Sequence, residues 1–376
     1  MPVSSRCRAP RTPRRRLRRK ARPAPPGRDQ VPFRPGRVHR DVWEVSTQPL
    51  SVHPWGVSRD GWPGSALAGC LEAAIAAPSV HNSQPWLFRL GTDRIDVLAD
   101  FSRGLPWLDP RSRELIISVG AAILNLRVAV LRHGRLPLLR LLPSPGQPEL
   151  MARLTLDRQA RPDETVRSLA AAIPRRHTNR RPFADSPVPD DTMRELVGAA
   201  AAEGAAFAPA HPVTRDAILS LVRTADHWQR AAAGYRDELS TWTVPVPGRQ
   251  DGVPHSAFGP RDVSDALPLR DFGLTQMQVT RRLASFEAHP VLAVVSTYGD
   301  QRRHWLRAGM AMERVLLTAT VRGLATTPMT QPLELPRLRP LLCDPDEGRV
   351  AQVILRLGYG RPAAGSPRRP LAEFLI

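Results

Sequence analysis

Hydrophobic and polar positions along the chain predict both helices and strands. Residues 66–77 are rich in alanine and periodic enough for a helix, which Pro78 ends because proline cannot continue the hydrogen-bond ladder. Two apolar stretches, 87–90 and 95–99, lie on either side of a Gly-Thr-Asp turn, and this arrangement predicts a β-hairpin. Further apolar stretches predict strands at 150–156 and 350–357.

One long helical pattern occurs twice. Within 116–133, apolar residues recur at spacings of three and four and so predict one face of a helix: Val119, Ile123, Leu126 and Val130. Residues 120–134 and 309–323 align without a gap at an offset of 189, and both stretches run from glycine to glycine. Gly134, which closes the first stretch, suits a left-handed helix C-cap. This similarity predicts two related halves within one chain, and the alternative is two unrelated amphipathic helices.

The composition is that of a globular protein with a basic N-terminal extension. The 376 residues are 42% hydrophobic, which is enough for a sizeable core in one large or two ordinary domains. Of the formal charge of +19, residues 1–40 supply +13, from fourteen Arg or Lys residues and the single acid Asp29. The other 336 residues carry only +6, and the predominance of Arg, Ala and Pro indicates a GC-rich coding sequence more than a phosphate-binding surface.

The first sixty residues have no apolar period and are rich in Arg, Pro and Gly, so we expect them to be disordered. We find neither a secretory signal nor an 18-residue apolar span, which argues against export and membrane insertion. A nucleic-acid arm, an anchor for acidic membranes, a targeting peptide and a start codon assigned too far upstream all remain open for this extension. Cys7, Cys70 and Cys343 are too few and too scattered for a disulfide framework or a zinc site, which fits a reducing cytoplasm.

The stretch APSVHNSQPW at 77–86 combines two prolines, four small polar groups and a large aromatic residue. It connects the predicted helix to the strand that starts at Trp86, so its polar residues occupy a corner with exposed backbone groups. Amide side chains in such a corner can read the hydrogen-bonding edge of a planar heterocycle, while the prolines limit the entropy of the loop. The alternative is a capped helix end whose polar residues satisfy local backbone groups.

This string closely resembles the flavin-contacting loop of the nitroreductase superfamily, a segment of the form A-P-S-x-x-N-x-Q-P-W that lies against the isoalloxazine ring of FMN. The resemblance implies an FMN cofactor and flavin contacts from Pro78, Ser79, Val80, Asn82 and Gln84. We assign no proton-transfer role to His81 or His177, because isolated histidines are more often hydrogen-bonded structural groups. We identify no catalytic residue and predict no metal site.

Two arginine-containing segments resemble the parts of nitroreductases that hold the FMN phosphate and ribityl chain. The segment RRHTNRRPF at 175–183 resembles the signature R-[RH]-S-x-[KR]-x-F, which implies cofactor contacts from Arg175, Arg176, His177, Thr178 and Arg180. Four guanidinium groups this close repel one another unless an anion lies among them, and the alternative is a solvated surface segment. Residues 366–371 resemble a C-terminal segment that closes on the same phosphate, which adds Arg368 and Arg369 as candidates.

The segment 323–332 resembles the family's G-L-x-x-x-P-[IM]-x-G loop, which runs past the reactive N5 edge of the flavin. This resemblance implies contacts from Thr327, Pro328, Met329 and Thr330. Where reductases commonly have Glu-Gly, this chain has Thr330-Gln331. A glycine lets backbone N–H groups approach N5 closely, so its loss argues against hydride transfer, though not against binding.

The resemblance implies an α+β, nitroreductase-like fold in which two fused half-domains, at 61–165 and 166–376, form a pseudo-dimer. The first half contains the Asn82 corner and the second contains the arginine segments, so we expect one complete FMN site per chain. Residues 244–271 are rich in Pro, Gly and Asp without a period, and we expect them to form a lid over the flavin. These features most resemble the Acg-like, actinobacterial branch of the superfamily, which is linked to dormancy.

Two functions therefore compete. We expect a cytoplasmic, FMN-binding flavoprotein that sequesters flavin with little turnover, and the alternative is an NAD(P)H-dependent oxidoreductase of nitroaromatics or quinones. Nucleic-acid binding through residues 1–60 is a distant third hypothesis. We expect a monomeric pseudo-dimer or a homodimer, without a membrane partner.

Overall fold

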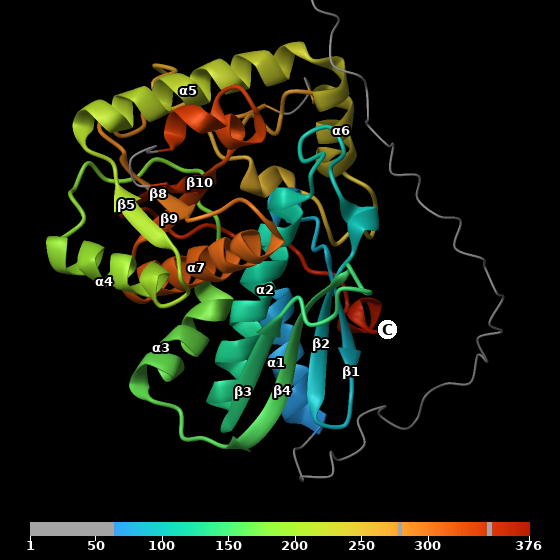
Figure 1. Cartoon of the computed structure of the whole chain (residues 1–376). Coiled ribbons are helices and arrows are strands. Elements are labelled where there is room, and N and C mark those ends of the chain that lie inside the picture. The colour runs from blue at the N-terminus through green and yellow to red at the C-terminus, as the bar shows by residue number, and fades with distance from the viewer. Residues whose placement is uncertain (1–63, 277–279, 344–347) are drawn as a thin grey trace, which may run out of the picture. The chain divides into compact units, whose positions relative to one another are not determined.

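The computed structural model describes residues 64–276, 280–343 and 348–376 (Figure 1). The predicted disordered extension at 1–60 lies outside these residues. The described residues form helices and two four-stranded antiparallel sheets, in agreement with the α+β class predicted from the sequence.

The first sheet has the strand order β1-β2-β4-β3. Its strands are β1 (Trp86–Leu90), β2 (Arg94–Ala99), β3 (Arg135–Leu141) and β4 (Leu150–Gln159). The predicted hairpin is confirmed, because β1 pairs with β2 from Trp86 opposite Ala99 to Leu90 opposite Ile95. Two helices, α1 (Gly64–Ile75) and α2 (Arg113–Arg132), pack against each other beside this sheet (Figure 1).

The second sheet repeats the strand order of the first, as β5-β8-β10-β9. Its strands are β5 (Ala206–Pro209), β8 (Val291–Thr297), β9 (Ala325–Met329) and β10 (Val350–Gly358). In each sheet a 20-residue helix connects the second strand to the third, namely α2 in the first and α7 (Arg302–Val321) in the second. A shorter helix, α4 (Asp190–Ala201), precedes β5 as α1 precedes β1.

The helices α2 and α7 cross where each has a glycine. A Cβ atom on Gly120 would collide with the Leu306 carbonyl group and would lie 3.0 Å from the Cα atom of Gly309. Both helices end as the sequence predicts, with Gly134 at a φ of +80° and Gly323 at a φ of +73°. Residues of α2 and α7 belong to one hydrophobic core that also includes residues of both sheets.

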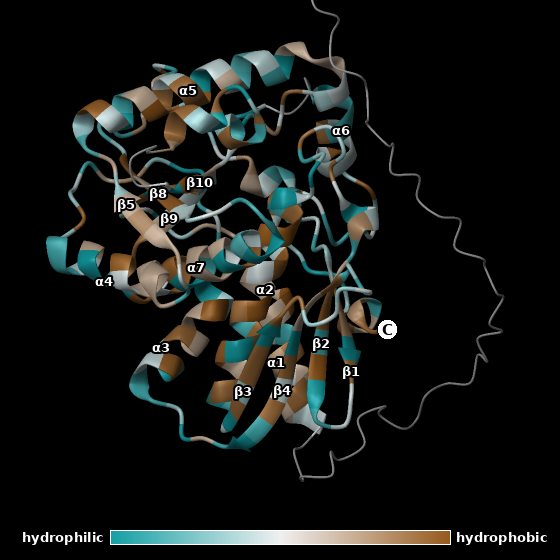
Figure 2. Cartoon of the chain, in the orientation of Figure 1, coloured by the Kyte–Doolittle hydropathy of each residue, from teal (hydrophilic) through white to brown (hydrophobic). Residues whose placement is uncertain are grey.

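A long inserted region separates β5 from β8. It contains α5 (Pro212–Ala231), α6 (Ala233–Thr243), a 3-10 helix (His255–Ala257) and the short parallel strands β6 (Arg261–Asp262) and β7 (Leu283–Ala284). Hydrophobic and hydrophilic residues alternate along α5, as in a helix with one buried side (Figure 2). The stretch 244–271 is irregular apart from the 3-10 helix and β6. It packs through a second hydrophobic cluster that includes Tyr235, Leu239, Trp242, Val253, Phe258 and Phe272.

Two segments cross between the sheets. The helix α3 (Glu164–Ala172) follows β4 and contacts both α2 and α7. The C-terminal segment returns from β10 to the first sheet, where Leu375 forms a parallel bridge with Phe88 (Figure 1). There Phe374 stacks on Trp86 with 6.5 Å between the ring centroids. The end of the chain thus becomes part of the first sheet's packing.

The helix α2 is long and apolar enough to cross a membrane by length and composition, which corrects the expectation that the chain has no such span. Its few polar side chains, such as Ser118 and Asn125, do not outweigh its many aliphatic ones. Of its most apolar window, 89% is buried inside the fold. The apolar character of α2 is therefore explained by its packing against α1 and α7.

Candidate functional site

Two adjoining pockets lie where the corner after α1 meets the start of α2, the middle of α7, the end of β9 and the inserted region. The apolar pocket encloses about 810 Å³ up to its open side, and its apolar lining includes Val80, Ile117, Leu269, Phe272, Met312, Pro328, Met329 and Val353. The basic pocket encloses about 470 Å³, and its lining includes Asn82, Arg176, His177, Val253, Ser366 and Arg368. Both pockets are lined by Pro78, Ser79, His81, Thr178 and Arg180. The two pockets therefore adjoin, and together they are called the cleft, with an apolar end and a basic end.

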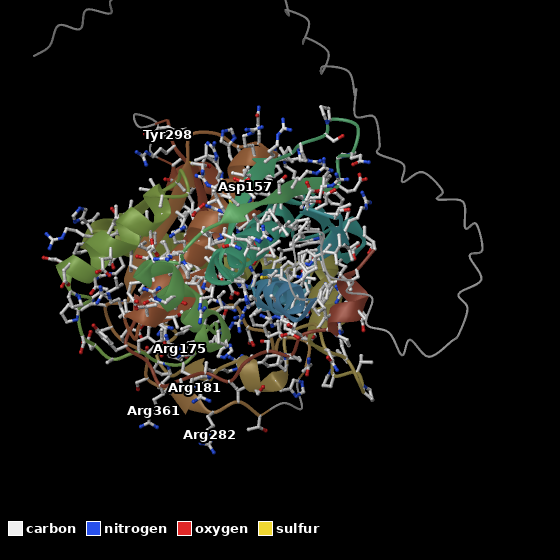
Figure 3. All side chains as sticks on the ribbon, turned by 90° about the horizontal axis from the view of Figure 1, so that it is seen from below. Asp157, Arg175, Arg181, Arg282, Tyr298 and Arg361 are labelled. Carbon is white, nitrogen blue, oxygen red and sulfur yellow. The ribbon has the colours of Figure 1, made fainter. Side chains whose placement is uncertain are left out.

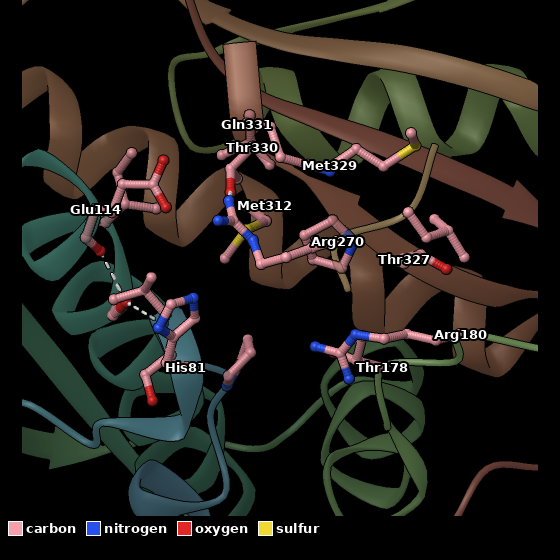
Figure 4. Close-up of a pocket in the computed structure, with 18 of the residues that line it drawn as sticks. His81, Glu114, Thr178, Arg180, Arg270, Met312, Thr327, Met329, Thr330 and Gln331 are labelled. Atoms are coloured by element: carbon pink, nitrogen blue, oxygen red, sulfur yellow. Dashed lines mark hydrogen bonds between the residues drawn. The ribbon is translucent and has the colours of Figure 1, made fainter. Parts of the chain in front are cut away.

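The corner at 78–85 has an unusual backbone conformation. His81, Asn82 and Gln84 have φ values of +49°, +56° and +52°, in the left-handed region that residues other than glycine seldom adopt. The Val80 N–H group donates a hydrogen bond of 3.1 Å to Ser118 Oγ on α2. Ser118 Oγ in turn donates to the Glu114 carbonyl oxygen over 2.7 Å (Figure 4). These bonds fix the corner to the first turns of α2.

The amide of Asn82 is fully engaged with other parts of the chain. Its Nδ2 donates to the carbonyl oxygens of Gly252 and Pro367, at 3.0 and 3.1 Å, and its Oδ1 accepts from Arg368 at 2.9 Å. Asn82 thus joins the corner, the inserted region and the C-terminal segment at the wall of the basic pocket. The sequence predicts that its amide reads the ligand, but both of its N–H groups already have protein partners.

Gln84 lies outside the lining of both pockets. It is completely buried, and its Nε2 donates to the Gln250 carbonyl oxygen over 3.0 Å while its Oε1 accepts from the Arg369 N–H group. The residue therefore ties the inserted region and the C-terminal segment to the corner. Its polar side-chain atoms bond to backbone groups, and its predicted flavin contact stays a prediction.

Two of the predicted arginines, Arg176 and Arg368, line the basic pocket but already have partners in the protein. Arg176 is 4% exposed, lies 3.3 Å from Glu313 through its Nε atom and donates to the Ala76 carbonyl oxygen. Arg368 donates to the carbonyl oxygens of Ile75, Ala76 and Ala77 at the end of α1. Those carbonyls lack partners within a helix, so Arg368 acts as a C-terminal cap as well as a pocket wall.

Arg180 is the predicted arginine whose charge is least compensated. Among the described residues it forms no ion pair, and its guanidinium donates one hydrogen bond, to the Ala257 carbonyl oxygen. The group lies 4.5 Å from the centre of the Phe272 ring. Burial, together with the charges of Arg270 and Arg281, lowers its pKa to about 10, so it remains a cation at neutral pH. It faces the junction of the two pockets with donors to spare.

The remaining predicted arginines do not reach the cleft. Arg175 is exposed, donates to the Ala171 carbonyl oxygen and lies on the same side of the molecule as Arg181, Arg282 and Arg361 (Figure 3). Arg369 donates to the Gln84 carbonyl oxygen and lies 4.3 Å from the centre of the Phe374 ring. The sequence placed both in binding motifs, but adjacent arginines in an extended segment point in different directions.

The segment after α7 that the sequence predicts as a loop forms strand β9 up to Met329, and it brings all four predicted residues, Thr327 to Thr330, to the apolar pocket. Gln331, which occupies the position of the family's glycine, is not among the residues with a positive φ. The Thr330 hydroxyl donates to Glu334 over 2.6 Å, and Gln331 donates to the Pro268 carbonyl oxygen over 3.1 Å. Arg270 completes the connection by an ion pair with Glu334. The Thr330-Gln331 pair therefore connects this loop to the inserted region.

Several lining residues were missed by the sequence reasoning. His81, Glu114, Ser118, Arg270, Phe272 and Met312 all line the apolar pocket. Polar Glu114 and Ser118, four residues apart on an otherwise apolar helix, were a detectable signal. Burial and the nearby Glu334 carboxylate raise the pKa of Glu114 to about 8. Arg270 and Phe272 gave no signal, because they lie in a segment without a period.

The described part of the chain contains no group of three or more His, Cys, Asp or Glu residues that could hold a metal ion. The groups that line the cleft suit an organic ligand instead. The cleft has apolar walls and one ring at one end, and hydroxyls, an imidazole and guanidinium groups toward the other. Such a cleft suits a ligand with a planar apolar part and an anionic part.

Comparison with known proteins identifies relatives along most of the chain. The model of the Nitroreductase family matches residues 173–359. "Putative NAD(P)H nitroreductase Rv3131" of Mycobacterium tuberculosis (strain ATCC 25618 / H37Rv) is 33% identical over 310 residues, which are 81% of this chain and 89% of the relative. "Putative NAD(P)H nitroreductase acg" of the same strain is 29% identical over 313 residues, 82% of this chain and 94% of that one.

Solved structures of the same family are more distant. A nitroreductase with bound FMN from Bacteroides fragilis NCTC 9343 has 15% identity and a TM-score of 0.30, and covers 55% of this chain and 94% of its own. A nitroreductase-like family protein from Bacillus cereus has 18% identity and a TM-score of 0.32, with coverages of 55% and 92%. These sequence relatives show that the chain belongs to the nitroreductase family and is similar to Acg.

Proposed function

We propose that the chain is an FMN-binding flavoprotein that holds the flavin ring in the apolar pocket and the phosphate in the basic pocket. The shared lining of the two pockets supports this assignment, because it places an apolar and a basic site side by side, as one such ligand requires. The names of the mycobacterial relatives, as NAD(P)H nitroreductases, agree with it. When bound, the flavin would supply two-electron transfer through its ring.

The residues present fit such a ligand. Arg180 carries a half-buried charge without a carboxylate partner among the described residues, and this is the observation on which the proposal rests most. Arg180 would meet the polar part of the flavin, and Arg176 and Arg368 would surround its phosphate. Leu269, Phe272 and the loop after α7 would exclude water from the ring.

We propose further that the protein retains its flavin and turns over slowly. The inserted region is fixed on both sides of the cleft. It bonds to the corner through Asn82 and Gln84, and to the loop after α7 through the Arg270–Glu334 ion pair and Gln331. These bonds oppose opening of the inserted region, which supports slow exchange of the ligand.

The alternative is an active NAD(P)H-dependent reductase of nitroaromatics or quinones. The names of the mycobacterial relatives favour it. In this alternative the inserted region opens during turnover.

We also propose that the two halves are a fused pair that provides one site. The two sheets share a strand order, both halves contribute to the cleft, and the long helices cross at equivalent glycines, Gly120 and Gly309. These features support a duplicated ancestor whose halves became one chain.

The test begins with the full chain as purified. We expect a flavin absorbance spectrum, and FMN as the cofactor released on denaturation. Reduction by dithionite but not by NADH or NADPH under anaerobic conditions would favour sequestration. Steady oxidation of NAD(P)H with menadione or a nitrofuran would favour the reductase. A colourless protein that saturating FMN does not convert to a bound form would rule out both functions.

A pair of neighbouring arginines provides a matched control for this test. Arg180→Ala removes a charge that faces the cleft, and we expect FMN to bind about tenfold to a hundredfold more weakly. Arg175→Ala removes an exposed charge five residues away and should leave the FMN dissociation constant unchanged. Fluorescence titration measures both. Equal effects from the two variants would contradict the assignment of the cleft.

A further inference from the structure

His81 has no hydrogen-bond partner for either ring nitrogen among the described residues, although its side chain is buried and the residue is only 6% exposed. An unpaired buried polar group destabilises the fold, because its lost hydrogen bonds to water are not replaced. The residue also has left-handed backbone angles, φ +49° and ψ +23°, which cost more for a side chain of this size. These two unfavourable features at one position indicate that the His81 ring forms its hydrogen bonds with a bound ligand.

The position of His81 indicates which part of a bound ligand its ring would contact. His81 is one of the residues that line both pockets, so it lies at the junction between the apolar and the basic end. Its ring meets Phe272 edge to face, with 5.4 Å between the centroids. His81 and Arg180 lie on opposite sides of the pocket, and the guanidinium of Arg180 points toward His81 (Figure 4). A ligand that reaches from one pocket to the other has to pass between them.

The protonation state of the His81 ring indicates which ligand groups it can bind. Burial and the charges of Arg270 and Arg180 lower the pKa of His81 well below its ordinary value, so the ring is neutral at physiological pH. A neutral imidazole has one N–H donor and one lone-pair acceptor. Hydroxyl groups, which both donate and accept, match this pair. A phosphate only accepts, and the guanidinium groups of the cleft suit it better.

We propose that His81 binds the hydroxyl-bearing chain that links the ring of the flavin to its phosphate. This inference rests on the proposed function and assigns a positioning role within it. The imidazole donates to one hydroxyl oxygen and accepts from a second hydroxyl, and Ser79 and Thr178 line the same junction. No proton is transferred, since no described side chain bonds to the ring nitrogens to relay one.

Three flavins that differ only outside the ring test this assignment. FMN has the chain and the phosphate, riboflavin has the chain alone, and lumiflavin has a methyl group in place of the chain. Dissociation constants are measured for wild type, for His81→Phe, which removes both polar atoms, and for His227→Phe, an exposed histidine on α5, as the control. We expect His81→Phe to weaken FMN and riboflavin about tenfold, and lumiflavin less than about twofold.

The other patterns overturn the inference. An equal loss with all three flavins would place His81 at the ring, a loss with FMN alone would place it at the phosphate, and no loss would remove it from the site. If wild type binds none of the three, the proposed function fails and this inference fails with it. A wild type that binds flavin while His81→Phe shows any of the first three patterns overturns this inference alone.

Two further measurements cover the risk that His81→Phe does not fold. His81→Asn keeps a side chain that tolerates the left-handed backbone, and its shorter amide should lose the same chain contact. In wild type, the ¹⁵N resonances of the His81 ring should shift on addition of riboflavin and not of lumiflavin. Identical shifts with the two ligands would contradict the proposal without any variant.

Discussion

The charged residues beside the cleft differ in how far neighbouring protein charges neutralise them. Glu313 on α7 is completely buried and faces Arg176, Arg368 and Asn125. Burial raises its pKa from an ordinary 4.5 to about 7, although the two arginines oppose this shift. Glu313 is therefore a carboxyl group whose charge changes within the physiological range, directly behind the basic pocket.

This arrangement predicts a pH-dependent stability. The folded state holds the Glu313 proton more tightly than the unfolded state, so the contribution is fully present below about pH 4.5 and is lost as the pH rises through about 7. The loss amounts to about 3 kcal/mol. Glu313→Gln, which does not titrate, should flatten the decline of the unfolding free energy over this window. Urea unfolding at several pH values measures it.

The control for this prediction is Glu195→Gln, which removes an exposed acid paired with Arg322. It should leave the pH slope as in wild type. Asp109 and Glu114, whose pKa values burial raises to about 6 and about 8, act with the same sign but are present in every variant. A Glu313→Gln protein with the wild-type slope would show that Glu313 stays ionised in the fold.

The sequence located the corner correctly but not what its side chains do. Asn82 and Gln84 were recognisable from their neighbours in the chain, because a helix end, two prolines and a strand bracket them. Their partners are Gly252, Pro367 and Gln250, more than 160 residues away. No local pattern encodes contacts at that separation. For the same reason the sequence could not separate Arg180 from Arg175. Only the fold decides that Arg180 lines the cleft while Arg175 faces solvent.

At the scale of elements, the crossing of α2 and α7 depends on two missing side chains. Cβ atoms on Gly120 or Gly309 would collide with the backbone carbonyls of Leu306 and Ile117 respectively. The hydrogen bonds of a helix fix the orientation of its carbonyl groups. The two helices would therefore have to move apart, which would disrupt the packing of the core around them.

Gly120→Ala and Gly309→Ala should therefore destabilise the protein by about 3 kcal/mol or more, as overpacking of a tight core does. Gly198→Ala in α4 is the matched control, because a Cβ atom added there would have no other atom within 4 Å. There alanine should stabilise the helix by about 0.5–1 kcal/mol through its higher helix propensity. Thermal unfolding compares the three. A Gly120→Ala protein as stable as wild type would mean that the helices cross elsewhere.

The elements that the sequence predicted are those with an unbroken period. α2, α7, the β1–β2 hairpin and β10 all have one, and each was found close to its predicted position. β3 was missed because Pro137 interrupts its alternation. α5 was missed although its buried residues Ile218, Val222 and Ala225 recur at helical spacings of four and three. The stretch 244–271 was expected to lack a regular period and is irregular apart from a 3-10 helix and β6, and its attachment to both sides of the cleft depends on single residues such as Arg270.

At the scale of the whole molecule, the repeated topology raises the question of a second site. An offset of 189 places Ile123 where α7 has Met312, and Leu306 where α2 has Ile117. Ile123 and Leu306 are completely buried in the main core, whereas Met312 and Ile117 line the apolar pocket. The connection between helix and strand also differs. It spans 76–85 between α1 and β1, but only 202–205 between α4 and β5.

The second half thus lacks the corner loop that forms one wall of the cleft, and Glu203 in the short connection pairs with Arg127 and Arg314 instead. An acid at this place opposes a phosphate by its charge. We therefore expect one FMN per chain, whatever the oligomeric state. Titration of the apoprotein with FMN, with the chain concentration fixed by amino-acid analysis, should reach its end point at a ratio of one. An end point of two would require a cleft on the Glu203 side, and an end point of one half would require a site built from two chains, so either value would contradict the fused, single-site arrangement.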